Sequence, residues 1–140
     1  MSESRSVLFV CLHGAAKSIL AAADFRRLAA ERGLDLVADS AGTEPDPEIA
    51  PGVVAALRAE GLDLSRQRPR RVTREDTAGA ARVVTFGCDL GETMPASVPV
   101  ERWDDVPAVS EDFTRADEAI RNRVVALIEE LSNSKRNRAR

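Results

Sequence analysis

Apolar residues along this chain occur either in short continuous runs or in longer stripes with helical spacing. The first run, VLFV at residues 7–10, is β-branched and aromatic, which predicts a strand buried on both faces. Similar but weaker patterns predict three further strands at residues 34–38, 81–86 and 98–103. Each of these runs is too short for a helix, so the chain is expected to contain a sheet of buried strands.

Helical patterns separate the predicted strands. They cover residues 18–32 and 51–60, and each is followed by a glycine that suits a helix end. The clearest helix is the last one, with Ser110 as the expected N-cap and Glu111 and Asp112 in its first turn. Its apolar stripe consists of Phe113, Ala116, Ile120, Val124, Leu127 and Leu131.

Strands and helices that alternate in this way predict right-handed βαβ crossovers, a parallel sheet and helices on both of its faces. We expect one domain at residues 1–131 and a basic, disordered tail at residues 132–140. Ligands of such folds bind at the carboxyl ends of the strands. Both cysteines, Cys11 and Cys88, follow a predicted strand at that end.

Composition narrows the class of protein further. The 140 residues suit one core, and a net charge of −3 gives no reason to expect a specific nucleic-acid partner. Two cysteines are too few for a disulfide scaffold, and no apolar run approaches the roughly 20 residues of a membrane span. The polar start shows no leader pattern, so we expect a cytoplasmic protein with free thiols and no membrane partner.

The segment from Cys11 to Ser18 carries the candidate chemistry. It leads from a strand end into a helix start, where backbone N–H groups and the helix dipole bind phosphate-like anions. The helix N-terminus and Lys17 both favour a thiolate at Cys11, and Ser18 can donate a hydrogen bond to it or cap the helix. The expected oxyanion-binding residues are Leu12, His13, Gly14, Ala15, Ala16 and Lys17.

Each of these residues also has a plainer interpretation. A cysteine after an apolar strand is often a small buried hydrophobe, and a single histidine is usually structural or at the surface. The combination of a strand, Cys11, a loop of small residues, Lys17, Ser18 and a helix favours the oxyanion site over these interpretations.

The same segment resembles the signature of the low-molecular-weight protein tyrosine phosphatase family, which is Cys, five residues, Arg, then Ser or Thr. Within that family the chain is similar to thioredoxin-coupled arsenate reductases. The stretches that carry this resemblance are SAGTEP at 40–45, GLDLS at 61–65 with Arg68-Pro69, and VVTFGC at 83–88. The resemblance covers residues 6–131 and implies a doubly wound, three-layer α/β sandwich with a four-stranded parallel sheet in the order 2-1-3-4.

Two departures fall in the loop itself. Lys17 stands where the family has arginine, and an ammonium lacks the two-pronged grip of a guanidinium on an oxyanion. Gly14 stands where the family has asparagine. Both residue types tolerate a positive φ, so we expect the loop to keep its shape.

Two further departures concern the acid and the second thiol. The family's acid is an Asp before a proline, but Val106 precedes Pro107 here, so Asp105 is the nearest substitute and is otherwise a solvated carboxylate. Cys88 matches the second cysteine of the reductases, whereas no thiol stands near Met94, where the third is expected. Cys88 then either attacks Cys11 directly, gives way to an external thiol reductant, or is only a buried strand-end residue.

These residues predict a cysteine-dependent oxyanion enzyme, either arsenate reductase-like or a phosphoester hydrolase. The proposed catalytic residues are Cys11, Lys17, Ser18, Cys88 and Asp105, without metal or cofactor. The expected partners are a small oxyanion (arsenate, phosphate or sulfate) or a phosphoester. The alternative is a non-catalytic oxyanion-binding or regulatory protein derived from this family, which the changes at Lys17 and Val106 would both fit.

Overall fold

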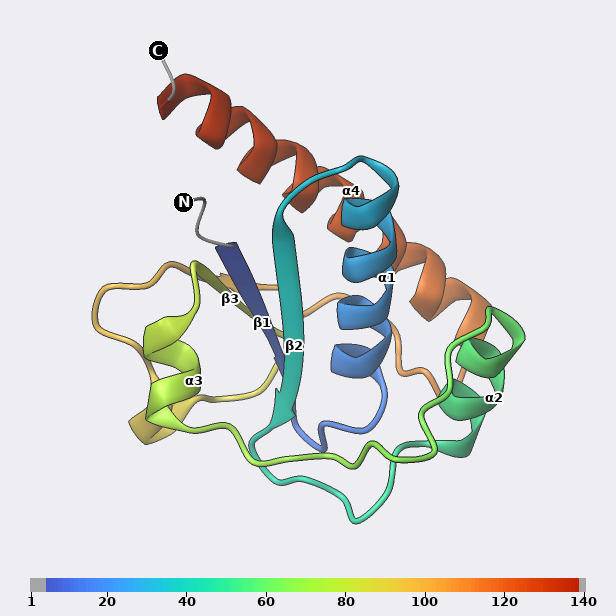
Figure 1. Ribbon diagram of the computed structural model, residues 1–140. Helices are drawn as coiled ribbons and strands as arrows, with labels where there is room; N and C mark the ends of the chain where they lie inside the picture. The colour runs from blue at the N-terminus through green and yellow to red at the C-terminus, as the bar shows by residue number, and fades with distance from the viewer. Residues whose placement is uncertain (1–4, 139–140) are drawn as a thin grey trace.

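The computed structural model describes residues 5–138, with side chains described as far as Asn133. Within these residues the strands form one sheet that has helices packed on both faces (Figure 1). The strands are β1 (Arg5–Cys11), β2 (Leu36–Gly42), β3 (Arg82–Thr85) and β4 (Val100–Arg102). All neighbouring strands are parallel and their order is β2-β1-β3-β4, which confirms the predicted fold.

The helices divide between the two faces of the sheet. They are α1 (Lys17–Glu31), α2 (Pro51–Ala59), the short α3 (Arg74–Gly79), the 3₁₀ turn η1 (Gly91–Thr93) and α4 (Phe113–Arg138). In Figure 1, α1, α2 and α4 lie on one side of the sheet and α3 on the other.

The hydrophobic core consists of two clusters, one on each face of the sheet. Phe9 of β1 packs into the larger cluster, which includes Phe25 and Trp103, whereas Leu8 and Val10 pack into a smaller cluster on the face of α3. Successive side chains of a strand point to opposite faces, so a continuous apolar run fills both clusters. This arrangement explains why β1 carries no polar position between residues 7 and 10.

Two elements differ from the sequence prediction. Strand β2 lies later than residues 34–38, because Gly33, with φ at 65°, and the N–H of Leu34, bonded to the Ala29 carbonyl, end the preceding helix. Helix α3 was not predicted, although Thr73 and Asp76 form a reciprocal capping box at its start. The spacing of Thr73 and Asp76 was the signal that would have revealed this helix.

Helix α4 differs from its prediction at both ends. The N–H of Arg115 bonds to the Asp112 carboxylate at 3.1 Å, so Asp112 caps this helix rather than Ser110. The backbone continues as helix past Leu131 to Arg138, so the described part of the expected tail is helical, and residues 139–140 lie outside the described residues. No helix in the described part of the chain is long and apolar enough to cross a membrane.

A pair of carboxyl groups is buried where α1 packs against α4. Asp24 is 1% exposed, and both Asp24 Oδ2 and Asp117 Oδ1 are buried without a described hydrogen-bond donor. Burial, and then the negative charge of Asp117, raise the pKa of Asp24 to about 7, with Arg27 and Arg121 acting in the opposite direction. One shared proton satisfies both carboxyl groups, so Asp24 is neutral below that pH.

We expect Asp24→Asn to remove a pH dependence of stability. An Asp whose pKa is raised in the folded state holds a proton that the unfolded chain releases, so wild-type stability falls as pH rises from about 4 to about 7. Each pH unit in that window corresponds to about 1.4 kcal/mol. Urea unfolding of the variant, followed by fluorescence of the buried Trp103, should change little between pH 5 and 8 and show it more stable than wild type at pH 8.

The exposed Glu31→Gln, also on α1, is the matched control and should leave the wild-type pH dependence unchanged. Wild-type stability that rises from pH 5 to pH 8 would contradict the buried, protonated pair.

Candidate functional site

The candidate oxyanion loop consists of residues 12–16, between the end of β1 and the start of α1. Backbone carbonyls of this loop, and that of Cys11 before it, point to a second segment, residues 43–50. The carbonyls of Leu12, His13 and Ala15 accept hydrogen bonds of 2.7, 3.0 and 3.0 Å from the N–H groups of residues 44, 46 and 50. The carbonyl of Cys11 likewise accepts a hydrogen bond of 3.2 Å from the N–H of Thr43. The loop is therefore held from outside by its carbonyl oxygens.

The N–H groups of residues 12–16 are available by contrast. Within the described residues, none of them donates to a backbone or side-chain acceptor. The first turn of α1 adds further N–H groups that have no partner inside the helix. Together these donors form the kind of site that binds a tetrahedral anion.

Two glycines fix the position of the loop. Gly14 has φ at 60°, as expected for a residue that replaces asparagine in the family signature. A Cβ atom on Gly14 would lie 2.9 Å from the N atom of Gly42, and a Cβ on Gly42 would lie 2.6 Å from the N atom of Gly14. The loop can approach the end of β2 this closely only because neither residue has a side chain.

Cys11 and Ser18 are brought together as predicted. Cys11 Sγ lies 3.0 Å from Ser18 Oγ, and the two residues are 7% and 0% exposed. When the thiol is ionised, the hydroxyl is the donor and stabilises the negative sulfur at the start of α1. This arrangement suits a nucleophile more than a core cysteine, since a buried hydrophobe needs no hydroxyl partner.

Lys17 reaches the site, but its ammonium is engaged elsewhere. Lys17 Nζ donates to the carbonyl oxygen of Val106 at 3.0 Å. The Lys17 side chain therefore forms part of the wall of the site. Its hydrogen bond joins the start of α1 to the segment after β4. An ammonium has three donors, so Lys17 can hold this carbonyl and still attract an anion.

The structure does not bring Asp105 to the site. Its side chain is 72% exposed and forms an ion pair with Arg123 of α4. The hydrogen bond from Arg123 lowers the pKa of Asp105, which keeps the carboxyl ionised at neutral pH. An ionised carboxylate that is paired outside the pocket has no proton to give to a leaving group there.

Cys88 lies near the nucleophile, on the other face of the sheet. Its Sγ is 3.5 Å from the carbonyl of Val10, and the residue packs against the smaller core cluster, whereas Cys11 belongs to the larger one. Burial raises the pKa of the Cys88 thiol, and the negative charge of Cys11 adds to this effect. The two thiols therefore interact, but the β1 backbone stands between them.

A pocket of about 570 Å³ opens above the loop. Among its lining residues are Cys11, Lys17 and several apolar side chains, including Leu12, Val109 and Phe113. No pattern in the sequence indicated that residues within 108–113 and 46–53 would line this pocket. Only Asp46 in that second stretch carries a charge toward the pocket, and no motif marked it. In the described part of the chain, no group of three or more His, Cys, Asp or Glu residues is placed to hold a metal ion.

Comparison with known proteins shows to which family the chain is related. The model of the family "Low molecular weight phosphotyrosine protein phosphatase" matches residues 6–137. The chain belongs to this phosphatase family. The resemblance predicted from the sequence is thereby confirmed, and the match includes the oxyanion loop, Cys88 and helix α4.

The similar proteins include both named arsenate reductases and named phosphatases. A putative arsenate reductase of Halobacterium salinarum is 30% identical over 129 residues, covering 89% of this chain and 91% of that protein. A low molecular weight protein-tyrosine-phosphatase of Bacillus subtilis is 40% identical over 79 residues, about half of each chain. The structure of a thioredoxin-dependent arsenate reductase of Corynebacterium glutamicum matches with a TM-score of 0.79 and 27% identity, covering 95% of this chain and 64% of that one.

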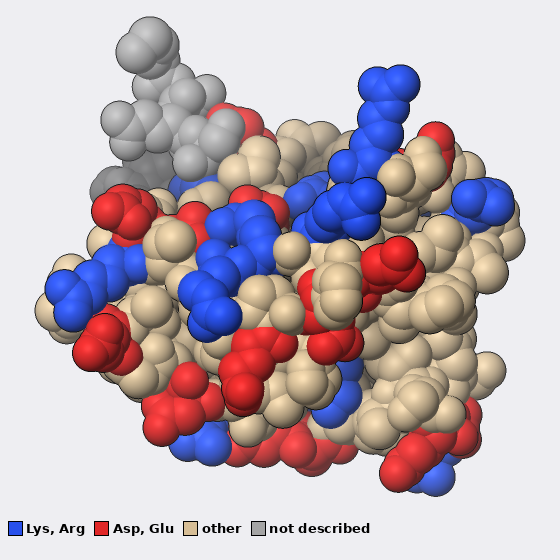
Figure 2. Space-filling model, turned by 90° about the horizontal axis from the view of Figure 1, so that it is seen from below, with Lys and Arg blue, Asp and Glu red and all other residues tan. Residues whose placement is uncertain are grey.

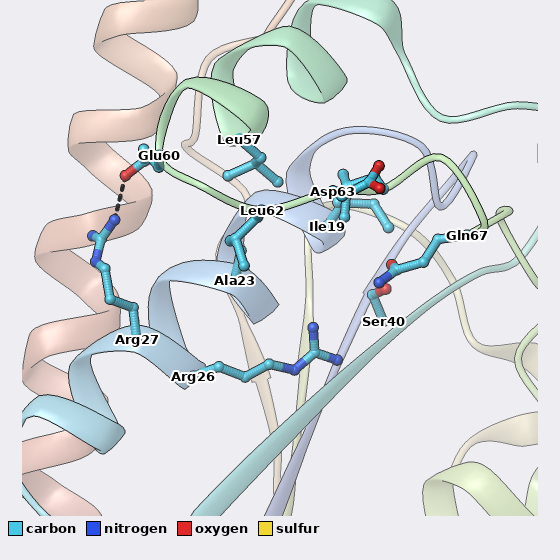
Figure 3. A pocket seen from close by; sticks show the side chains of 11 residues that line it. Ile19, Ala23, Arg26, Arg27, Ser40, Leu57, Glu60, Leu62, Asp63 and Gln67 are labelled. Atoms are coloured by element: carbon cyan, nitrogen blue, oxygen red, sulfur yellow. Dashed lines mark hydrogen bonds and ion pairs between the residues drawn. The ribbon is translucent and has the colours of Figure 1, made fainter.

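A second pocket, of about 340 Å³, lies between α1 and the residues that follow α2 (Figure 3). Figure 3 shows an apolar floor that includes Ile19, Ala23 and Leu57, and a rim where Arg27 pairs with Glu60. No cysteine, histidine or lysine lines it, so it lacks the thiol nucleophile that the sequence predicts. The chemistry expected of a phosphatase-family protein therefore belongs to the first pocket.

The surface around the carboxyl ends of the strands carries charges of both signs. Figure 2 views the molecule from this end and shows blue and red side chains mixed on the left and centre, with a mostly uncharged area on the right, where α2 lies. Charges of opposite sign are also paired elsewhere, since Arg70 forms ion pairs with both Asp39 and Asp76. Among the described residues on this face, charges of both signs are therefore interspersed rather than gathered into a field of one sign.

We expect Gly42→Ala to displace the oxyanion loop. The added Cβ would meet backbone atoms of Gly14 and His13 at 2.6–2.9 Å, and backbone cannot rotate away as a side chain can. Overpacking of this kind typically costs about 1–3 kcal/mol. Thermal unfolding should show the loss of stability, and phosphate should no longer protect Cys11 from iodoacetamide.

Gly79→Ala is the matched control, because nothing lies within 4 Å of a Cβ at that position. Equal stability and equal anion protection in the two variants would contradict the close approach of Gly14 and Gly42.

Proposed function

We propose that this protein is an enzyme in which Cys11 attacks a tetrahedral oxyanion bound by the loop at residues 12–16, with arsenate as the leading substrate. The observation that carries the proposal is the buried contact of 3.0 Å between Cys11 and Ser18 beneath backbone N–H groups that have no other acceptor in the described structure. A thiolate held in this way points at the centre of a bound anion and is ready for in-line attack.

Arsenate reduction accounts for Cys88 as well as Cys11. The Cys11 thiolate forms an S–As bond as one arsenate oxygen leaves as water. Cys88 starts on the other face of the sheet, so the next step requires the segment after β3 to move until the Cys88 sulfur reaches Cys11. The Cys88 thiolate then attacks Cys11 Sγ, the electron pair of the S–As bond passes to arsenic, and arsenite leaves as a Cys11–Cys88 disulfide forms. An external thiol reduces this disulfide, so the proposal requires a thiol reductant as partner. The relative from Halobacterium salinarum, named a putative arsenate reductase, supports this order of preference.

Phosphomonoester hydrolysis is the second candidate, because the pocket is large and has apolar walls. A volume of about 570 Å³ is in the range of sites for organic ligands and far exceeds one tetrahedral anion. Leu12, Val109 and Phe113 could pack against the organic group of an ester. The first step, attack by Cys11, is common to both candidates.

The decisive experiment measures the alkylation of Cys11 together with the formation of arsenite or p-nitrophenol. The reduced protein is treated with arsenate or p-nitrophenyl phosphate in the presence of dithiothreitol, with Cys11→Ser as the blank. We expect arsenite to form, and phosphate, arsenate and sulfate to slow alkylation of Cys11 more than that of Cys88. Peptide mapping without reductant should recover a Cys11–Cys88 disulfide from the arsenate reaction.

Each alternative has its own signature in this experiment. Cys88→Ser should keep the anion protection of Cys11 but lose the disulfide, and turnover should then depend on the external thiol. Release of p-nitrophenol without arsenite would favour the hydrolase. Anion protection without any turnover would identify a non-catalytic oxyanion-binding protein, and no protection at all would overturn the oxyanion site.

We expect weak phosphatase activity in the wild type and a higher kcat/KM for p-nitrophenyl phosphate in Lys17→Arg. A guanidinium can grip two equatorial oxygens of the transition state, whereas the Lys17 ammonium is a single point charge that also holds the Val106 carbonyl. Loss of one well-placed donor typically costs about 2.7–4 kcal/mol of transition-state stabilisation. Wild-type turnover of aryl phosphates at the rate of an average enzyme would contradict this account of Lys17.

A further inference from the structure

The only histidine of the chain, His13, stands in the oxyanion loop and lines the pocket above Cys11. Its Nδ1 atom lies 3.2 Å from Asp46 Oδ1 and 3.3 Å from the backbone carbonyl of Glu44. Both neighbours are acceptors, so Nδ1 must carry the proton. Nε2 bonds to no residue that the structure describes, which leaves it free to take up or release a proton.

Asp46 is held in place for this contact. Its own N–H donates to the His13 carbonyl at 3.0 Å, so backbone and side chain join the same two residues. Pro45 and Pro47 flank it and restrict the backbone on both sides. A carboxylate that bonds Nδ1–H fixes the tautomer and the orientation of the ring, as in hydrolases with an Asp–His pair.

The pocket leaves the role of proton donor open. Asp105 lies outside it and is paired with Arg123, and Val106 has no ionisable side chain. The ionisable side chains that line the pocket are Cys11, His13, Lys17 and Asp46. Cys11 is the nucleophile and Lys17 holds a carbonyl, so His13, with Asp46 behind it, is the group suited to move a proton.

We propose that His13 is the general acid and base of this site and that Asp46 is its positioning residue. The inference rests on the proposed function of Cys11. For a phosphomonoester, His13 begins the reaction with both ring nitrogens protonated. The S–P bond forms as the P–O bond to the leaving group breaks, and the Nε2 proton passes to the departing oxygen to give an alcohol, which leaves the ring neutral with its proton on Nδ1. Neutral His13 then takes a proton from the water that attacks phosphorus, the S–P bond breaks, and its electron pair returns to Cys11. With arsenate, the same proton converts the departing hydroxyl to water.

The tautomer can be measured without any assay of activity. Because the chain has one histidine, ¹⁵N–¹H correlation spectra of its ring are unambiguous. At a pH where the ring is neutral, we expect Nδ1 to be protonated and Nε2 to be bare. The opposite tautomer would overturn the assignment, since Nε2 would then have no free lone pair to accept a proton from water.

The catalytic role is tested with a series of phosphomonoesters whose leaving groups range from nitrophenols to simple alcohols. An acid matters most where the leaving oxygen is strongly basic. His13→Gln should therefore lower kcat by about 100-fold or more for poor leaving groups and much less for nitrophenols. The limb of the pH–rate profile that reports the proton on His13 should also disappear. Asp46→Asn should change the leaving-group dependence in the same direction by a smaller factor.

Glu48→Gln is the matched control, because Glu48 is an exposed carboxylate of the same segment and does not line the pocket. It should behave as wild type throughout. Phosphate should protect Cys11 from alkylation equally in wild type and His13→Gln, which shows an intact loop. A uniform loss for all leaving groups, or none, with that protection intact would overturn the role of His13 and leave the proposed function standing. Loss of protection and turnover in the wild type itself would overturn both.

Discussion

The contact on which this site depends is the meeting of two backbones at Gly14 and Gly42. With no Cβ on either residue, the oxyanion loop lies directly against the carboxyl end of β2. Gly42 is also bonded on its other side, since its N–H donates to the Arg70 carbonyl and its carbonyl accepts from Val72. The loop thus rests on a strand that is itself fixed from both sides. Its carbonyl oxygens turn outward to residues 43–50, and its N–H groups are left for a ligand.

The same end of the sheet gathers residues that are far apart in the sequence. Cys11 ends β1, residues 43–50 follow β2, and Cys88 follows β3, so parallel strands bring all three to one edge. The supporting helices α1 and α4 pack through an interface that is mainly apolar and also contains Asp24 and Asp117.

Sequence alone predicted the parts of the protein that local patterns determine. The apolar run before Cys11, the small residues after it and the start of α1 are contiguous, so the Cys11–Ser18 pair followed from spacing. The position of Asp105 could not be predicted, because its partner depends on how α4 packs, which brings Arg123 against it. The side of the sheet on which Cys88 lies could not be read either, since it depends on where β3 ends. Asp46 belongs to a loop without periodicity, and only the fold places it beside His13.

The bond from Lys17 to residue 106 has a consequence for how this protein can change in evolution. The ammonium holds the carbonyl oxygen of Val106, an atom that every amino acid supplies. Substitutions at residue 106 that preserve the backbone path therefore leave the bond intact. The adjoining wall of the pocket, which includes Ala108 and Val109, can then vary in size and polarity while its attachment to α1 persists. Substitutions in this wall can therefore change which substrates fit the pocket without changing the residues that bind the anion.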